Sequence, residues 1–129
     1  MKAEDLQALV DYRMQRAAET LEEARLMQNV NHWNTCANRL YYAAFYAVSA
    51  LLVRDGRTTS KHSGVKALFN RHYVKPGIVS RENGRLYNQL FDLRQEGDYI
   101  DFVFLEPETV APLVEATAAF IHTIQSLLQ

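Results

Sequence analysis

Two residues near the end of one polar segment have side chains that can act on a phosphate. In the segment LRQEGDY, Arg94 stands five residues before Tyr99, with Asp98 between them. A guanidinium can stabilise charge that develops on a phosphate, and a phenol can donate or accept a proton beside it. The same residues also fit a structural role, in which Arg94 pairs with Asp98 and Tyr99 packs its ring. On these residues alone the structural role is favoured.

A second segment, Ser60 to Gly64, combines a lysine, an imidazole and two hydroxyls. Lys61 and His62 stand where a helix is expected to begin. Helix N-termini bind anions through free backbone N–H groups, so these residues can form an anion site. Equally, Ser60 or Ser63 can cap the helix, and the residues do not decide between the two.

Arg39 is a third candidate, because it lies in an otherwise apolar stretch beside Tyr41 and Tyr42. A buried arginine must be paired or must face a ligand. One interpretation is a contact to an anion or a nucleotide. The other, which we favour, is a structural ion pair with a carboxylate of the fourth helix, namely Asp92, Glu96 or Asp98.

Other kinds of chemistry have less support. The four histidines include no pair at the i, i+4 spacing of a helical metal site. The single cysteine, Cys36, excludes an intramolecular disulfide and a cysteine-rich zinc site, and we expect it to be buried. Neither a hydrolase Gly-x-Ser-x-Gly motif nor a phosphate-binding Gly-x-x-x-x-Gly-Lys loop is present. We predict no metal and no cofactor.

Charge is unevenly distributed along the chain. The net charge is −1, but residues 54–94 carry nine basic and three acidic side chains, while the remainder carries five basic and twelve acidic ones. The basic stretch can attract RNA, a nucleotide or an acidic partner. It can also be an ordinary solvated surface whose charges pair with the acidic helices.

The hydrophobic pattern predicts an all-α single domain over residues 1–129. Apolar residues recur at helical spacing over 4–29, 32–53 and 62–73, in a helix that starts at Arg81, and in a final helix that opens at 106–108. Asn31 and Ser80 are expected N-caps. We expect the fourth helix to weaken after Arg94, because Gly97 interrupts it, and residues 99–105 to form a loop. This is an up-and-down four-helix bundle with one additional short helix.

The second helix is apolar nearly all round from Leu40 to Val53, so we expect it to be central in the bundle. No stretch approaches the roughly 20 apolar residues of a membrane span, and no apolar signal region is visible near Met1. The expected location is therefore the cytoplasm, with no membrane contact.

Three segments together resemble the HEPN domain family, in particular its small stand-alone prokaryotic members. They are NRLYYAAFYAVSALL over 38–52, SKHSGV over 60–65 and LRQEGDY over 93–99. The resemblance covers nearly the whole chain. It implies a bundle of four to five helices that is commonly homodimeric. Many members are ribonucleases or toxins, many act with a minimal nucleotidyltransferase as antitoxin, and others bind nucleotides or serve as non-catalytic adaptors.

The chain departs from the ribonuclease members at one position. Those members carry Arg-x4-6-His near the end of the fourth helix, and two such motifs face each other across the dimer. Here Arg94 matches the arginine, but Tyr99 stands where a histidine is expected, and no histidine follows before His122. The toxin branch adds a tyrosine two residues later, and Asp101 stands there. An unperturbed phenol is a much poorer base than imidazole at neutral pH.

The resemblance leaves two functions open, beside a third possibility, a structural dimer that binds no ligand. The first is a homodimeric HEPN module that acts with a nucleotidyltransferase or binds nucleotide or RNA, in a toxin–antitoxin-like or stress and defence system. The second is a ribonuclease toxin that uses Arg94 with a non-standard partner. Candidate catalytic residues are Arg94 and Tyr99, and candidate nucleotide or RNA contacts are Arg39, Tyr42, Lys61, His62 and Asp98. An imidazole from another helix, that of His62, is one substitute for the missing histidine.

Overall fold

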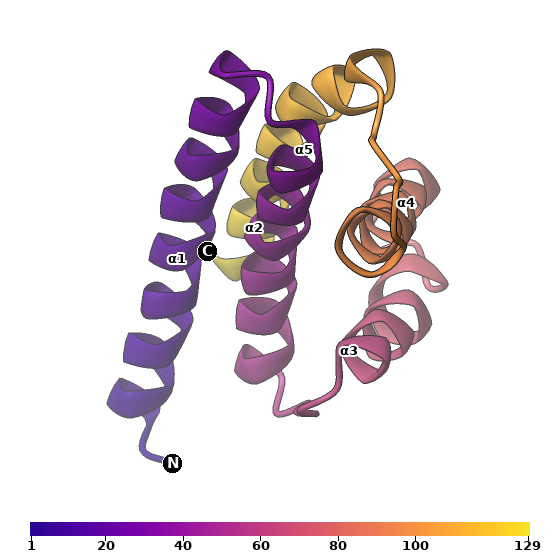
Figure 1. Ribbon diagram of the computed structural model, residues 1–129. Coiled ribbons are helices and arrows are strands. Elements are labelled where there is room, and N and C mark those ends of the chain that lie inside the picture. Colours follow the sequence, from indigo (N-terminus) through magenta and orange to yellow (C-terminus); the bar gives the residue numbers. More distant parts are fainter.

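The computed structural model describes all residues from Met1 to Gln129 and contains only helices and their connections. The helices are α1 (Ala3–Asn29), α2 (Trp33–Arg54), α3 (His62–Phe69), α4 (Arg81–Tyr99) and α5 (Pro107–Leu128), with a π-helical turn η1 (Asn70–Val74) after α3. In Figure 1, α1 and α2 run side by side, and α5 lies behind α2. The all-α bundle with a short additional helix is confirmed.

Helix α2 is the centre of the bundle, as its composition predicts. Thirteen of its 22 residues are buried, and it packs against α1, α3, α4 and α5. Its alanines Ala43, Ala44, Ala47 and Ala50 are fully buried, and their small side chains let neighbouring helices approach closely. Cys36 is also fully buried and unpaired.

Helix α4 is longer than the sequence predicts. It runs through Gly97 and ends at Tyr99. The glycine is accommodated because α4 passes close to α2 here: a Cβ at position 97 would lie 3.3 Å from Leu105 Cδ1 and 3.5 Å from Asn34 Cγ. As expected, Ser80 caps the helix, and its hydroxyl accepts a hydrogen bond from the Asn83 amide at 3.1 Å.

The expected helix caps were wrong. Asn31 is not an N-cap; it occupies a left-handed turn conformation with a φ of 61°, and His32 precedes α2 without a side-chain cap. Neither Ser60 nor Ser63 caps α3, whose N-cap is Lys61. The helix expected over 62–73 is confirmed: it is α-helical to Phe69 and continues as the π-helical turn to Val74.

Candidate functional site

Arg94 of α4 is buried, with 7% of its surface exposed, and is surrounded by phenol rings. One Nη atom donates hydrogen bonds to the hydroxyls of Tyr99 at 2.9 Å and Tyr42 at 3.2 Å. The guanidinium carbon lies 5.2–5.3 Å from the ring centres of Tyr41, Tyr42 and Tyr99. The negative faces of aromatic rings attract a cation, so these contacts stabilise the charged guanidinium.

The charge of Arg94 is incompletely satisfied. The nearest carboxylate is that of Asp98, one helical turn away, whose Oδ2 lies 3.5 Å from Nε. Nε itself has no hydrogen-bond partner. Asp98 instead accepts a hydrogen bond from Asn38 Nδ2 at 2.7 Å. The predicted Arg94–Asp98 pair therefore forms, but it is long, and a buried guanidinium N–H remains free.

Arg39 forms a structural pair, although the predicted partners are wrong. Its Nη1 lies 3.1 Å from Glu23 of α1, and its Nε and Nη2 donate to Asn38 Oδ1. The Arg39 side chain pairs with α1, so Asp92, Glu96 and Asp98 of α4 are not its ion-pair partners. The Arg39 guanidinium nevertheless lies 5.2 Å from the Tyr42 ring centre, so Tyr42 contacts the cations of both Arg39 and Arg94.

His62, the first residue of α3, lies against the same tyrosines. Its Nδ1 is 2.7 Å from the Tyr41 hydroxyl. Its ring stacks on Phe45 at 4.5 Å between centres and meets Tyr42 edge to face at 5.6 Å. Burial, together with the positive charge of Arg94, lowers the pKa of His62 below its usual 6.5. The imidazole is therefore neutral at pH 7.

Tyr41 connects this imidazole to the core. It is fully buried, and burial raises its pKa to about 12, so it keeps its proton at physiological pH. The buried Tyr87 ring lies 5.9 Å from it, and the Tyr87 hydroxyl has no hydrogen-bond partner. Burial raises the pKa of Tyr87 well above its usual value. Both phenols therefore keep their protons at physiological pH and carry no charge.

Half-buried rings of α2 extend the site toward the surface. We call Tyr42, Phe45, Tyr46 and His62 the aromatic face. Neighbouring ring centres within it lie 4.5–6.5 Å apart, and all four residues are partly exposed. The guanidinium of Arg16 on α1 lies 5.3 Å from the Tyr46 ring centre. The guanidinium groups of Arg16 and Arg39 thus lie over partly exposed rings of this surface.

The segment that follows Arg94 exposes large apolar side chains. The exposed fractions are 69% for Tyr99, 54% for Ile100, 94% for Phe102 and 80% for Phe104. We call these four residues the exposed loop patch. Phe102 has a φ of 64°, a conformation that bulky residues rarely adopt. The loop is nevertheless fixed at its ends, because Asn34 of α2 donates to the carbonyl of Val103 and accepts from the amide of Leu105, both at 2.8 Å.

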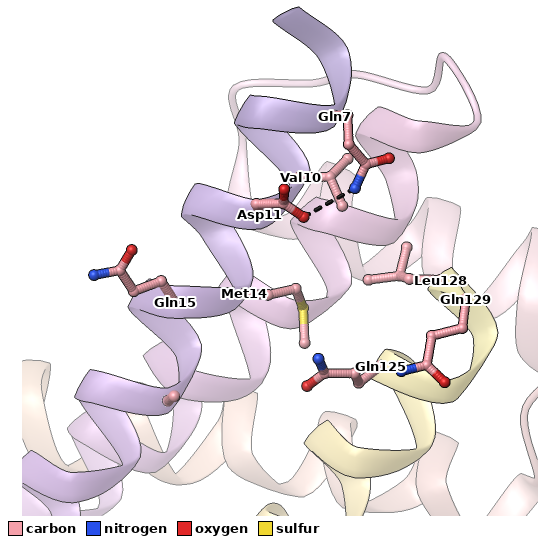
Figure 2. A pocket seen from close by; sticks show the side chains of 9 residues that line it. Gln7, Val10, Asp11, Met14, Gln15, Gln125, Leu128 and Gln129 are labelled. Carbon is pink, nitrogen blue, oxygen red and sulfur yellow. Dashed lines mark hydrogen bonds between the residues drawn. The ribbon is translucent and has the colours of Figure 1, made fainter. Parts of the chain in front are cut away.

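The surface hollows differ in chemistry from the aromatic face. One of about 540 Å³ lies beside Tyr99 and is lined by Asp92, Gln95, Glu96, Tyr99 and Ile100, so its carboxylates oppose phosphate binding. Another, of about 380 Å³, lies between α1 and α5. Figure 2 shows Met14 pointing into this space toward the side chain of Gln125, while the Gln7 amide, farther along α1, is bonded to Asp11.

The structure brings together most of the residues singled out in the sequence. Arg94, Tyr99, Asp98 and Tyr42 are in direct contact, while Arg39 joins through Tyr42 and His62 through Tyr41. Lys61 is exposed beside His62, and no hydrogen bond or ion pair links its ammonium to the others. No cluster of three or more metal-ligating side chains occurs, and no helix has the length and apolar character to cross a bilayer.

Three members of this arrangement, Asn38, Tyr41 and Phe45, were not predicted as site residues. Asn38 donates a hydrogen bond to Asp98. The Tyr41 hydroxyl bonds His62 Nδ1, and the Phe45 ring stacks on the imidazole. The spacing of the first two offered a signal, because residues three or four apart share one face of a helix. Nothing in the spacing, however, revealed which face of α2 would meet the start of α3.

Comparison with known proteins agrees with this architecture. The HEPN domain family matches residues 10–127. A UPF0332 protein of Thermotoga maritima is 41% identical over 121 residues, which cover 94% of this chain and 92% of that protein. A Methanocaldococcus jannaschii protein named "Putative toxin MJ0605" is 29% identical over 98% of this chain and 90% of its own length. A second protein of that organism, named "Putative toxin MJ0142", is 26% identical over 89% and 78%. The chain belongs to the HEPN domain family.

Proposed function

We propose that this chain is a toxin-like HEPN module that binds the phosphate groups of RNA or of a nucleotide at Arg94. The observation that carries the proposal is the incompletely satisfied guanidinium: Arg94 is buried, its Nε has no hydrogen-bond partner, and its only nearby carboxylate is 3.5 Å away. A buried cation without a close partner is costly, so its presence points to a negatively charged ligand. Two relatives named as putative toxins support the toxin-like role.

The aromatic face supplies the second half of a nucleic-acid contact. Its half-buried rings offer surfaces on which unstacked bases can stack, at about 1–3 kcal/mol per base. Arg16 and Arg39, which lie over two of these rings, can follow the phosphate backbone. The Tyr99 ring covers Arg94 and is itself 69% exposed, so its side chain can rotate into solvent when a phosphate arrives.

We further propose that the protein forms a homodimer through Ile100, Phe102 and Phe104 of the exposed loop patch, which leaves Tyr99 free to turn, and that it acts with a minimal nucleotidyltransferase. Exposed aromatic residues are typical anchors of protein interfaces. A symmetric contact through residues 100–104 would place two Arg94 sites near one shared surface. Analytical ultracentrifugation of the wild type and of Phe102→Ser with Phe104→Ser tests the dimer, which the double substitution should dissociate. Co-purification with the product of an adjacent nucleotidyltransferase gene tests the partner.

RNA affinity tests the ligand proposal most simply. Fluorescence anisotropy with a labelled single-stranded RNA should show at least tenfold weaker binding for Arg94→Ala, since one charge-assisted hydrogen bond contributes about 1.5–3 kcal/mol. Arg85→Ala is the matched control, because Arg85 is exposed on the same helix. Competition with AMP separates a nucleotide site from an RNA site. Equal affinity of the Arg94 and Arg85 variants would refute the proposal.

A ribonuclease is the second candidate function, and one observation favours it. The family's usual histidine is missing after Arg94, but the neutral imidazole of His62 lies against the same two tyrosine rings as the Arg94 guanidinium. Cleavage of total RNA by the wild type, abolished in Arg94→Ala, is the expected result for this function. Cleavage that persists in the variant would exclude Arg94 as the essential residue.

A further inference from the structure

The contacts of His62 go beyond packing. Its imidazole has one nitrogen, Nδ1, engaged with the Tyr41 hydroxyl at 2.7 Å, while Nε2 makes no hydrogen bond within the chain. The ring is held on three sides by Tyr41, Tyr42 and Phe45. Such a fixed imidazole with a free nitrogen is the arrangement required of a general base.

Tyr41 suits either protonation pattern of this imidazole. A hydroxyl can donate and accept, so it can accept a hydrogen bond from Nδ1–H when Nε2 is the free base. It can also donate to Nδ1 when Nε2 carries the proton. Because Tyr41 is fully buried, it does not exchange this role with solvent.

We infer that His62 is the general base of this site and replaces the histidine that the segment after Arg94 lacks. The inference rests on the proposed binding of RNA at Arg94. Nε2 of His62 takes the proton of a ribose 2′-hydroxyl, O2′ forms a bond to phosphorus, and the bond from phosphorus to O5′ breaks. The leaving O5′ takes a proton from water, and His62 returns its proton to solvent. The products are a 2′,3′-cyclic phosphate and a 5′-hydroxyl, and the Arg94 cation stabilises the charge that builds on the phosphate.

The electrostatic surroundings of His62 agree with this role. The groups that face it are the Tyr41 hydroxyl and the rings of Tyr42 and Phe45 from α2. The cation of Arg94 from α4 acts on it as well, and Lys61 precedes it in the chain. No carboxylate pairs with it. Burial and the Arg94 charge lower the pKa of His62 below 6.5, so the free base is the dominant form at neutral pH.

The test measures binding and cleavage in the same proteins. Wild type, His62→Gln and His62→Asn are compared on a labelled RNA and on its 2′-deoxy counterpart, with His122→Gln on the exposed face of α5 as the matched control. We expect both His62 variants to lose at least about 100-fold in cleavage rate, the usual range for a general base. The rates are compared at saturating RNA, so that any loss of base stacking on the aromatic face does not enter the comparison. His122→Gln should cleave normally, and the deoxy strand should stay intact. The wild-type rate should rise with pH through a midpoint below 6.5 and then level off, and the products should carry 2′,3′-cyclic phosphate ends.

Three results would overturn the inference in distinguishable ways. If both His62 variants cleave at the wild-type rate, another residue is the base. The wild type is tested over about two pH units on either side of neutrality. If it binds RNA through Arg94 but cleaves none in that range, His62 has no catalytic role and the binding function stands. If the wild type neither binds nor cleaves RNA, the proposed function fails as well.

Discussion

Replacing Arg94 by methionine should leave the fold intact while removing the phosphate site. Methionine is similar in length, unbranched and adaptable to the space between three rings. A buried charge that serves the fold is expected to destabilise the protein when it is removed. A buried charge that serves a ligand can be replaced by an apolar side chain at little or no cost.

The contacts of Arg94 give the expected size of the effect. Two hydrogen bonds to the hydroxyls of Tyr42 and Tyr99 stabilise the folded state by about 1.5–3 kcal/mol each, as bonds to a charged group. Against them stand several kcal/mol for burying the guanidinium and about 1–3 kcal/mol for the unpartnered Nε. After substitution, the half-buried Tyr42 and the exposed Tyr99 can turn their hydroxyls to water. The three contacts of the guanidinium with tyrosine rings are exchanged for contacts of the methionine sulfur with the same rings, which are of similar strength. The remaining contributions nearly cancel, so we expect the free energy of unfolding to change by less than about 1 kcal/mol.

Urea denaturation followed by circular dichroism measures this change, with Arg85→Met as the control for a charge removed from the surface of the same helix. The midpoint for Arg94→Met should match or exceed that of wild type, and the slope should be unchanged. A loss of more than about 3 kcal/mol, the cost of breaking a buried structural pair, would show that Arg94 holds the bundle together. The reasoning that assigns it to a ligand would then be refuted.

Four further predictions concern single sites. Burial lowers the pKa of His62 below 6.5, so as the pH falls the imidazole is protonated at a higher pH in the unfolded chain than in the folded one. The free energy of unfolding should therefore fall as the pH drops below 6.5, and it should fall less steeply in His62→Asn. Cys36, whose pKa burial raises to about 11, should resist iodoacetamide at pH 8 (below that pKa) until urea unfolds the chain; labelling of the folded protein at a rate above its unfolding rate would contradict this. Gly84→Ala places a Cβ 2.7 Å from Val74 Cγ1 and should cost about 1–3 kcal/mol, largely restored by adding Val74→Ala. At protein concentrations where the proposed dimer is dissociated, Phe102→Asn should raise stability by about 1 kcal/mol, because asparagine tolerates the φ of 64° and the ring, exposed in the single chain, loses no packing; lower stability there would show that the ring is anchored within the chain.

The helices and the central place of α2 could be predicted because apolar periodicity reports burial directly. Predictions failed where a residue with a known local preference serves another purpose. Gly97 favours an early end to α4, yet the helix continues to Tyr99, and the missing side chain leaves room for Asn34 and Leu105. Asn31 has the chemistry of an N-cap, but the sharp turn between α1 and α2 needs a left-handed residue, which asparagine also supplies.

The site was predictable in its members but not in its connections. Arg94, Tyr99 and Asp98 lie within one segment, so helical spacing alone brings them together. The approach of His62 to Tyr41 depends on how α3 packs on α2, which no spacing in the sequence encodes. The partner of Arg39 was wrong for the same reason: Glu23 of α1 reaches it because of the angle at which α1 and α2 pack.

The unpartnered Nε–H of Arg94 offers the most direct test of the central claim that this guanidinium binds phosphate. Its signal can be followed in nitrogen–proton correlation spectra of labelled protein and assigned by its disappearance in Arg94→Lys. On titration with single-stranded RNA, we expect the Arg94 Nε–H resonance to shift and saturate with the binding curve, while that of the exposed Arg85 stays nearly unchanged. Saturable RNA binding that leaves the Arg94 signal unmoved would contradict the account.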